Sequence, residues 1–232
     1  MNIKSKILNL IFPSKCIVCG EIIENDQIAI CKECIKKIEF NKRKCRICGK
    51  PLDTVYGEMI CFRCKRVRRP FAMAFVPFIY KGNVRTAIKR YKFYHKISFY
   101  KTFAYFIFEE IQKSGYVPDI VTYVPVHFTR LGERGFNQSK LVARELASLL
   151  GARLVPTLKK VKRTKPLYGM AARERENTVR GSFACKKEIG DCRRILIVDD
   201  IITTGATLSE CTKILKNLTN AEISIAVIAA AE

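Results

Sequence analysis

Residues 195–208 read ILIVDDIITTGATL, and this stretch decides the fold class of the chain. Its first four residues are branched and apolar, which is typical of a short strand buried on both faces. Two carboxylates, Asp199 and Asp200, follow at once, as expected at the carboxyl edge of a parallel sheet. A small turn rich in hydroxyl groups then opens an apolar periodic segment. The sequence therefore predicts a strand, a turn and a helix whose unpaired N–H groups can hold a phosphate.

Alternating strand and helix patterns surround this stretch. We expect strands at residues 75–80, 120–126, 153–158, 194–199 and 223–230. Helices are expected at residues 84–93, 98–113, 138–150 and 206–218, with a turn at 81–83 and a long basic loop at 159–181. This order is typical of a parallel α/β sheet with helices on both faces.

A second polar segment, VPVHFTRLGERGFNQ at residues 124–138, follows the strand expected at 120–126. It supplies His127, Arg130 and Arg134 around a glycine-bearing turn, and it places Asn137 as the N-cap of the next helix. Arginine forks suit phosphate groups, so we expect this segment to meet the acidic pair at the carboxyl edge of the sheet. A hydrogen-bonded structural histidine and a solvated approach to a helix are the alternatives.

Eight of the 11 cysteines form four C-x-x-C pairs in the first third of the chain. Two thiolates on one such knuckle can reach the same tetrahedral ion. A segment of this size buries little surface, so metal binding must supply its folding energy, which favours one ion for each consecutive set of four. We predict two structural zinc ions in a double zinc ribbon, held by Cys16, Cys19, Cys31 and Cys34 and by Cys45, Cys48, Cys61 and Cys64.

Other uses of these cysteines fit less well. Disulfides need an oxidising compartment, and iron–sulfur ligation is less typical of these spacings. We expect the cysteine-rich module to span residues 1–70 and the α/β core to span residues 71–232. The first 12 residues read as a short amphipathic helix.

The formal net charge of +22 over 232 residues indicates polyanionic partners: nucleic acid, nucleotide phosphates or both. A merely soluble cationic surface is the alternative. The longest apolar runs are far shorter than the roughly 20 residues that cross a bilayer, so we expect no membrane span and a cytoplasmic protein.

Two segments resemble known families. The order of apolar strand, DD, two-residue spacer, TTGAT and helix resembles, position for position, the phosphoribosyl pyrophosphate (PRPP) signature of the type I phosphoribosyltransferases. The string RGFNQ at residues 134–138 resembles the hallmark of the competence protein F family, which is linked to DNA uptake in naturally transformable bacteria. That family is also similar to this chain in its double zinc ribbon, so the resemblance spans nearly the whole sequence.

The resemblance implies a phosphoribosyltransferase-like core with defined roles. Asp199 and Asp200 would be the catalytic pair and would hold the ribose hydroxyls, while Mg²⁺ would accompany the pyrophosphate of PRPP. The implied pyrophosphate contacts are His127, Arg130 and Arg134. The implied PRPP-binding set is Asp199, Asp200, Thr203, Thr204, Gly205, Ala206 and Thr207.

We therefore predict a competence protein of DNA uptake and transformation that binds PRPP and single-stranded DNA and works with partners of the competence machinery. The alternative is an active Mg²⁺-dependent phosphoribosyltransferase of nucleotide metabolism with an unidentified acceptor. A regulator that reads duplex DNA is less favoured, because no recognition helix stands out.

Overall fold

The computed structural model describes residues 14–23, 28–52, 59–94, 96–165, 169–186 and 189–231, without the Arg134 side chain. The helix predicted over the first 12 residues lies outside this range. At the centre is a six-stranded sheet in the order β1-β8-β7-β3-β4, with β2 also paired to β8. Every pairing in it is parallel, as predicted. The strands are β1 Ala74–Phe75, β2 Phe78–Ile79, β3 Ile120–Tyr123, β4 Arg153–Leu154, β7 Arg194–Ile202 and β8 Glu222–Ala230.

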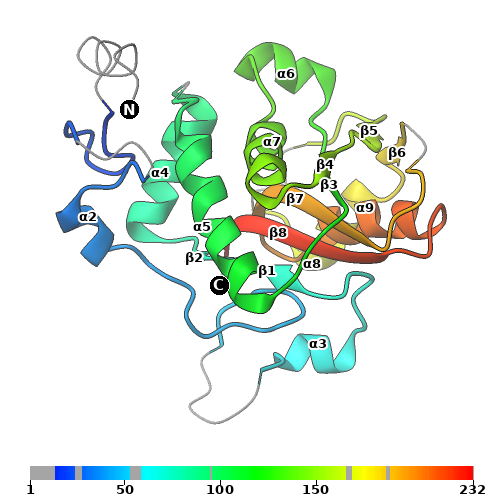
Figure 1. The fold of residues 1–232 in the computed structure, drawn as a ribbon. Coiled ribbons are helices and arrows are strands. Elements are labelled where there is room, and N and C mark those ends of the chain that lie inside the picture. Colours follow the sequence, from blue (N-terminus) through cyan, green and yellow to red (C-terminus); the bar gives the residue numbers. More distant parts are fainter. Residues whose placement is uncertain are drawn as a thin grey trace.

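Helices cover both faces of this sheet (Figure 1). Leu196 and Val198 of β7 pack into one core, and Ile195 and Ile197 pack into the other. This alternation follows from the two-residue period of a strand that is buried on both sides. The first core is closed by α4 Gly82–Phe93, α5 Phe99–Ser114 and α7 Gln138–Leu150, and the second by α9 Ala206–Lys216 with α8 Ala172–Val179 against it.

Several predicted elements need correction. The strand expected at 75–80 is two strands, because Pro77 between them has no N–H for the ladder. The turn expected at 81–83 is wrong, since α4 begins at Gly82. The strand expected at 153–158 is split into β4 and β5 Leu158–Lys160. The glycine-bearing turn before Asn137 contains a helix, α6 Phe128–Arg134, which lies above the end of the sheet (Figure 1).

The basic segment at 159–181 is not a loop throughout. β5 pairs antiparallel with β6 Phe183–Cys185, and α8 lies between them in sequence. The sequence pattern did not reveal α8 because Val179 is its one buried residue, so the helix has no apolar stripe. We call β5, α8, β6 and the described residues between them the flap, which lies beside the main sheet.

The two ribbons pack on opposite cores. Cys16, Ile17 and Ile30 of the first ribbon belong to the core that contains α4 and α5. Cys45, Cys48 and Cys64 of the second ribbon belong to the core that contains α9. In its described residues each ribbon has one short helix, α2 Lys32–Lys36 in the first and α3 Phe62–Arg66 in the second. The domain boundary near residue 70 stays a prediction.

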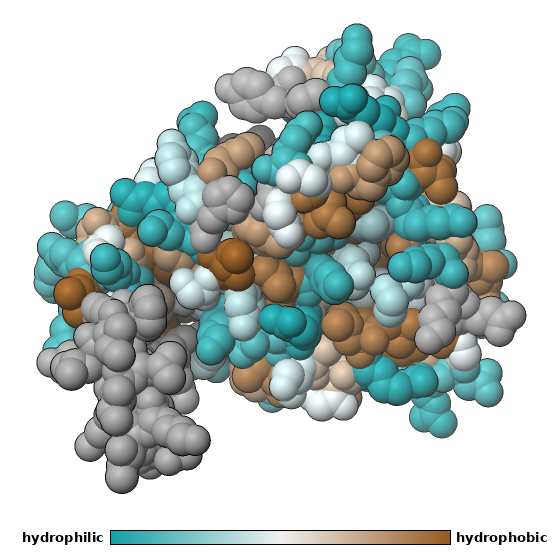
Figure 2. Space-filling view, turned by 90° about the horizontal axis from the view of Figure 1, so that it is seen from above, coloured by the Kyte–Doolittle hydropathy of each residue, from teal (hydrophilic) through white to brown (hydrophobic). Residues whose placement is uncertain are grey.

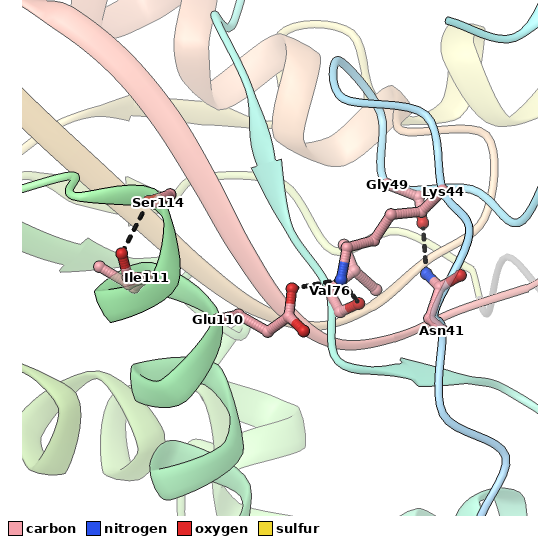
Figure 3. Close-up of polar contacts among 7 residues, drawn as sticks. All are labelled: Asn41, Lys44, Gly49, Val76, Glu110, Ile111 and Ser114. Carbon is pink, nitrogen blue, oxygen red and sulfur yellow. Dashed lines mark hydrogen bonds and ion pairs between the residues drawn. The ribbon is translucent and has the colours of Figure 1, made fainter. Parts of the chain in front are cut away.

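An ion pair fastens the second ribbon to α5 (Figure 3). The Lys44 ammonium contacts the Glu110 carboxylate and donates to the Val76 carbonyl at 3.1 Å. Nearby, the Asn41 side chain donates to the carbonyl of Gly49 at 2.7 Å, just after the first knuckle of the second ribbon. These contacts hold the ribbon in one orientation against the sheet. Among the described helices, none is long and apolar enough to cross a membrane.

Candidate functional site

The carboxyl ends of β3 and β7 bring the two polar segments to neighbouring positions. Tyr123 at the end of β3 is paired with Val198, and the Val124 N–H donates to the Val198 carbonyl at 2.9 Å. Beyond this point β7 continues to Ile202 along β8, without β3 on its other side. The acidic pair thus lies inside β7, which continues past the end predicted at residue 199. Here the edge of β7 that is not paired with β8 lies on the side of the segment that follows β3.

Three elements hold the acidic pair. Asp199 Oδ1 accepts hydrogen bonds from Ser139 Oγ of α7 and from the Asp200 N–H, both at 2.9 Å. Lys92 Nζ of α4 lies 2.8 Å from Asp200 Oδ2, and these two side chains are only 16% and 18% exposed. The carboxylates are therefore held in fixed positions before any ligand binds.

The environment of Asp199 alters its ionisation. Burial, followed by the charge of Asp200, raises the pKa of Asp199 to about 7, although Lys92 and the Ser139 hydroxyl oppose the rise. A carboxyl with such a pKa exchanges its proton near neutral pH. Hydrogen-bond donors on a bound sugar would favour the ionised form.

A small pocket opens where the chain turns from β7 into α9. Gly205 is the N-cap of α9 and has φ +79°, a left-handed conformation that glycine adopts without steric cost. The Thr204 hydroxyl accepts from the Ala206 N–H at 3.4 Å. Of the residues predicted to bind PRPP, all except Asp200 line this pocket: Asp199, Thr203, Thr204, Gly205, Ala206 and Thr207.

The residues predicted to contact pyrophosphate lie on the neighbouring segment. His127 is buried as the N-cap of α6, where its ring nitrogen Nδ1 accepts from the Thr129 N–H at 3.4 Å. The Arg130 guanidinium donates to the Thr164 carbonyl at 3.1 Å, which ties α6 to the flap. Arg134 is the last residue of α6. His127 thus has a capping role, and Arg130 holds the flap beside the site.

Two lysines near the acidic pair were not predicted as site residues. Lys92 reaches it from α4, and Lys160 reaches it from β5, where its Nζ donates to the Thr164 hydroxyl at 2.9 Å. Burial lowers the pKa of Lys160, and the nearby Arg130 charge lowers it too, while the Asp199 charge opposes this shift. Lys160 therefore lies within electrostatic reach of both polar segments. No local pattern marks either lysine, because only the fold brings them to the site.

Each set of four cysteines forms a separate cluster, as predicted. The sulfur atoms within a set all lie within 4.8 Å of one another. Sulfurs bound to one tetrahedral zinc at 2.3 Å are about 3.8 Å apart. The Cys19–Cys31 and Cys48–Cys61 sulfur pairs are 3.8 and 3.7 Å apart, so the donor sets fit zinc. A zinc ion in each cluster would cross-link its ribbon and would have a structural role.

A cationic groove of about 1080 Å³ is lined by residues of the first ribbon, of α4, of α5 and of the segment between these helices. We call it the ribbon groove. Among the described residues, no aspartate or glutamate lines the groove, while Tyr94 on its wall is 68% exposed. Its basic residues are Lys15, Lys89, Arg90, Lys96 and Lys101.

The face seen from above in Figure 1, where α6 lies, has mixed polarity. Hydrophilic side chains surround scattered apolar ones there, without one continuous apolar area (Figure 2). Such a face fits small polar ligands better than an extended apolar partner.

Comparison with known proteins agrees with this architecture. The double zinc ribbon domain family matches residues 7–65, and the phosphoribosyl transferase domain family matches residues 137–232. The second match contains the acidic pair, the turn and the start of α9. The two matched regions thus correspond to the cysteine clusters and to the pocket-bearing half of the sheet.

Full-length relatives share both parts. Competence protein F from Haemophilus influenzae is 28% identical over 225 residues, which cover 92% of this chain and 96% of that protein. The DNA utilization protein YhgH from Salmonella typhimurium is 26% identical, with 89% and 92% covered. Competence protein ComFC from Streptococcus pneumoniae is 26% identical, with 87% and 93% covered. With its double zinc ribbon followed by a parallel phosphoribosyltransferase-like sheet, this chain belongs to the family of competence protein F and YhgH.

Proposed function

We propose that this protein binds PRPP together with Mg²⁺ at the acidic pair and the turn before α9. The observation that carries the proposal is the shared pocket of Asp199 and residues 203–207 at the free edge of β7. The first backbone N–H groups of α9 would hold the 5′-phosphate, since they have no partner within the helix. Asp199 and Asp200 would accept hydrogen bonds from the ribose hydroxyls.

The cations around the pocket would complete the site. Arg130, Arg134 and Lys160 would neutralise the pyrophosphate, and Mg²⁺ would supply further positive charge there. His127 would act through its cap, by fixing the start of α6. Lys92 would hold the Asp200 carboxylate in place beside the sugar through their ion pair.

Calorimetry with PRPP and Mg²⁺ tests this proposal. Asp199→Asn combined with Asp200→Asn removes both acceptors, so we expect at least a tenfold loss of affinity, about 1.4 kcal/mol. Asp191→Asn is the matched control, because Asp191 is exposed on a different segment. Equal affinity of the double variant and the wild type would remove the pocket assignment.

We further propose that the ribbon groove binds single-stranded DNA, in keeping with the names of the competence and DNA utilization relatives. Its five basic residues would follow the phosphate backbone, and the exposed Tyr94 ring would stack on a base. The protein would act in the cytoplasm, where zinc-binding thiols stay reduced, beside partners of the competence machinery.

Fluorescence polarisation with a labelled oligonucleotide tests the groove. Lys96→Gln with Lys101→Gln should weaken binding and reduce the salt dependence by about 1.4 in log–log slope, since each lost phosphate contact contributes about 0.7. Lys113→Gln with Lys213→Gln is the control: it removes the same charge from exposed positions outside the groove. If both variants lose affinity equally, net charge and not the groove binds the DNA.

An active phosphoribosyltransferase is the second candidate. Lys160 supports it, because a partly buried cation near Asp199 would stabilise the pyrophosphate as it leaves the anomeric carbon. An acceptor atom would form the new bond to that carbon. Pyrophosphate release from PRPP, measured with bases, nucleotides and DNA as acceptors, distinguishes the two candidates. Release that depends on an acceptor and is lost in Lys160→Met would establish the enzyme, whereas no release with any acceptor favours binding alone.

A further inference from the structure

Arg69 connects the second zinc ribbon to the turn that begins α9. It follows the ribbon in sequence, five residues after the last ligand, Cys64. Its Nη1 atom lies 3.4 Å from the position that a Cβ on Gly205 would occupy, and its Cζ atom lies 3.8 Å from that position. The guanidinium therefore packs directly on the turn.

The same side chain reaches the metal-binding cluster. Its guanidinium lies within hydrogen-bonding reach of the Cys64 sulfur. Both residues also line one cavity of about 840 Å³ beside the start of β8. Arg69 thus lies beside a predicted zinc ligand on one side and beside the turn before α9 on the other.

One donor of Arg69 lacks an acceptor. Its Nε atom is buried and makes no hydrogen bond with the described residues. A buried donor without a partner is destabilising, so an incoming acceptor is favoured. Four thiolates around one zinc carry a net charge of −2, and a sugar phosphate is also an anion. A cation that lies between the two is attracted by both.

Packing around the turn makes this link stiff. Ile202 and Leu208, on either side of the turn, belong to the same core as Cys45, Cys48 and Cys64. A Cβ on Gly205 would also meet Ile202 Cδ1 at 3.5 Å, an ordinary contact distance, so Ile202 and Arg69 both pack beside the turn. The turn and the second cluster thus share one packed core, in which a displacement of one side would strain the other.

We propose that Arg69 is a positioning residue that couples the second zinc cluster to phosphate binding at the turn before α9. This inference rests on the proposed sugar-phosphate site. Because coupling between two sites is reciprocal, bound phosphate should retain the zinc of the second ribbon, and that zinc should strengthen phosphate binding.

The test measures zinc release into a coloured chelator, with and without saturating ribose 5-phosphate. This probe has the terminal phosphate and needs no Mg²⁺ that the chelator could remove. We expect ribose 5-phosphate to slow the release of one of the two zinc ions about fivefold or more in the wild type, a typical size for coupling between sites. The same probe should have no effect on Arg69→Gln, and Arg69→Lys should restore part of the effect.

Arg68→Gln is the matched control, because Arg68 is the exposed neighbour and loses the same charge. Zinc content and melting temperature show whether each variant is folded, and calorimetry shows whether it binds ribose 5-phosphate. Equal slowing in Arg69→Gln and the wild type would overturn the coupling. Binding without any slowing in the wild type would overturn it too, and would leave the pocket standing. No binding by the wild type would remove the pocket and the coupling together.

Discussion

The two ribbons have nearly the same cysteine spacing, yet they support different ends of the candidate site. The first packs on the core of α4, α5 and α7, and from that side Lys92 and Ser139 reach the acidic pair. The second packs on the core of α9, and from that side Arg69 reaches the turn at Gly205. Similar metal-binding sequences thus acquire different roles from the surfaces they cover.

The cysteines of the second cluster are also more buried than those of the first. In the first, only Cys16 is buried, whereas in the second Cys45, Cys48 and Cys64 are all buried. A buried cysteine packs against the core as well as binding the metal, so its replacement also destabilises the core outside the ribbon. We therefore expect the second ribbon to have the larger influence on phosphate binding.

The largest effect should come from comparing one ligand of each ribbon. Cys64→Ser should lower the melting temperature by about 10 °C, which corresponds to several kcal/mol in a chain of this size, and should weaken PRPP binding at least tenfold. Cys19→Ser, at the exposed end of the first cluster, should leave PRPP affinity within about threefold of the wild type. Zinc content, thermal unfolding and calorimetry provide the measurements. Equal losses of affinity in the two variants would contradict the comparison.

A smaller effect should be a pH dependence of protein stability that arises from Asp199 of the acidic pair. Asp199 has a pKa of about 7 in the folded protein, against about 3.9 in an unfolded chain. The folded protein therefore holds this proton more tightly, and the stability this provides is lost as the pH rises through 7.

Asn does not titrate, so Asp199→Asn should raise the melting temperature of the ligand-free protein by several degrees at pH 8 and much less at pH 5. Asp191→Asn is the control, since Asp191 is exposed. Thermal unfolding across this pH range gives the comparison, and a gain that does not vary with pH would show that Asp199 is not the titrating group.

A third effect concerns the ion pair of Lys92 and Asp200, which is mostly buried. Lys92→Met and Asp200→Asn should each lower stability, and their double variant should lose less than the sum. The expected coupling is about 1–2 kcal/mol, within the range for residues in direct contact. Denaturant unfolding of the four proteins measures it. Strictly additive losses would mean that α4 does not hold the acidic pair.

The smallest effect should come from the ion pair of Arg63 and Glu176, which joins the second ribbon to α8 at 3.2 Å. Its side chains are 39% and 49% exposed, so solvent screens the attraction. Arg63→Gln should change neither PRPP affinity nor the melting temperature measurably. If it weakened binding as strongly as Arg69→Gln, the link from this ribbon to the site would run through α8 instead of through Arg69.

The parts of the molecule that could be predicted from sequence are those with a local signal. The buried strand at 195–198 is marked by a continuous run of branched apolar residues, and the helix α7 by its periodicity. Asn137 caps α7 as expected, accepting from the Lys140 N–H at 3.1 Å. The zinc clusters follow from ligand spacing, because one knuckle already aims two sulfurs at one point.

The remaining parts depend on contacts between distant segments. α8 has one buried residue and no apolar stripe, so its pattern resembled that of a loop. Lys92, Lys160 and Arg69 lie far from the acidic pair and the turn in sequence, and only the packing of α4, the flap and the second ribbon brings them close. His127 was predicted to lie in the segment after β3, but its role as a helix cap was not. That role depends on α6, and the glycines of this segment indicated a turn instead of a helix.

The most direct test of the central claim is a crystal structure of the protein with PRPP and Mg²⁺. We expect the 5′-phosphate to accept hydrogen bonds from the N–H groups of residues 204–207 and the ribose hydroxyls to lie within hydrogen-bond distance of Asp199 and Asp200. A ligand bound elsewhere while this pocket stays empty would contradict the account.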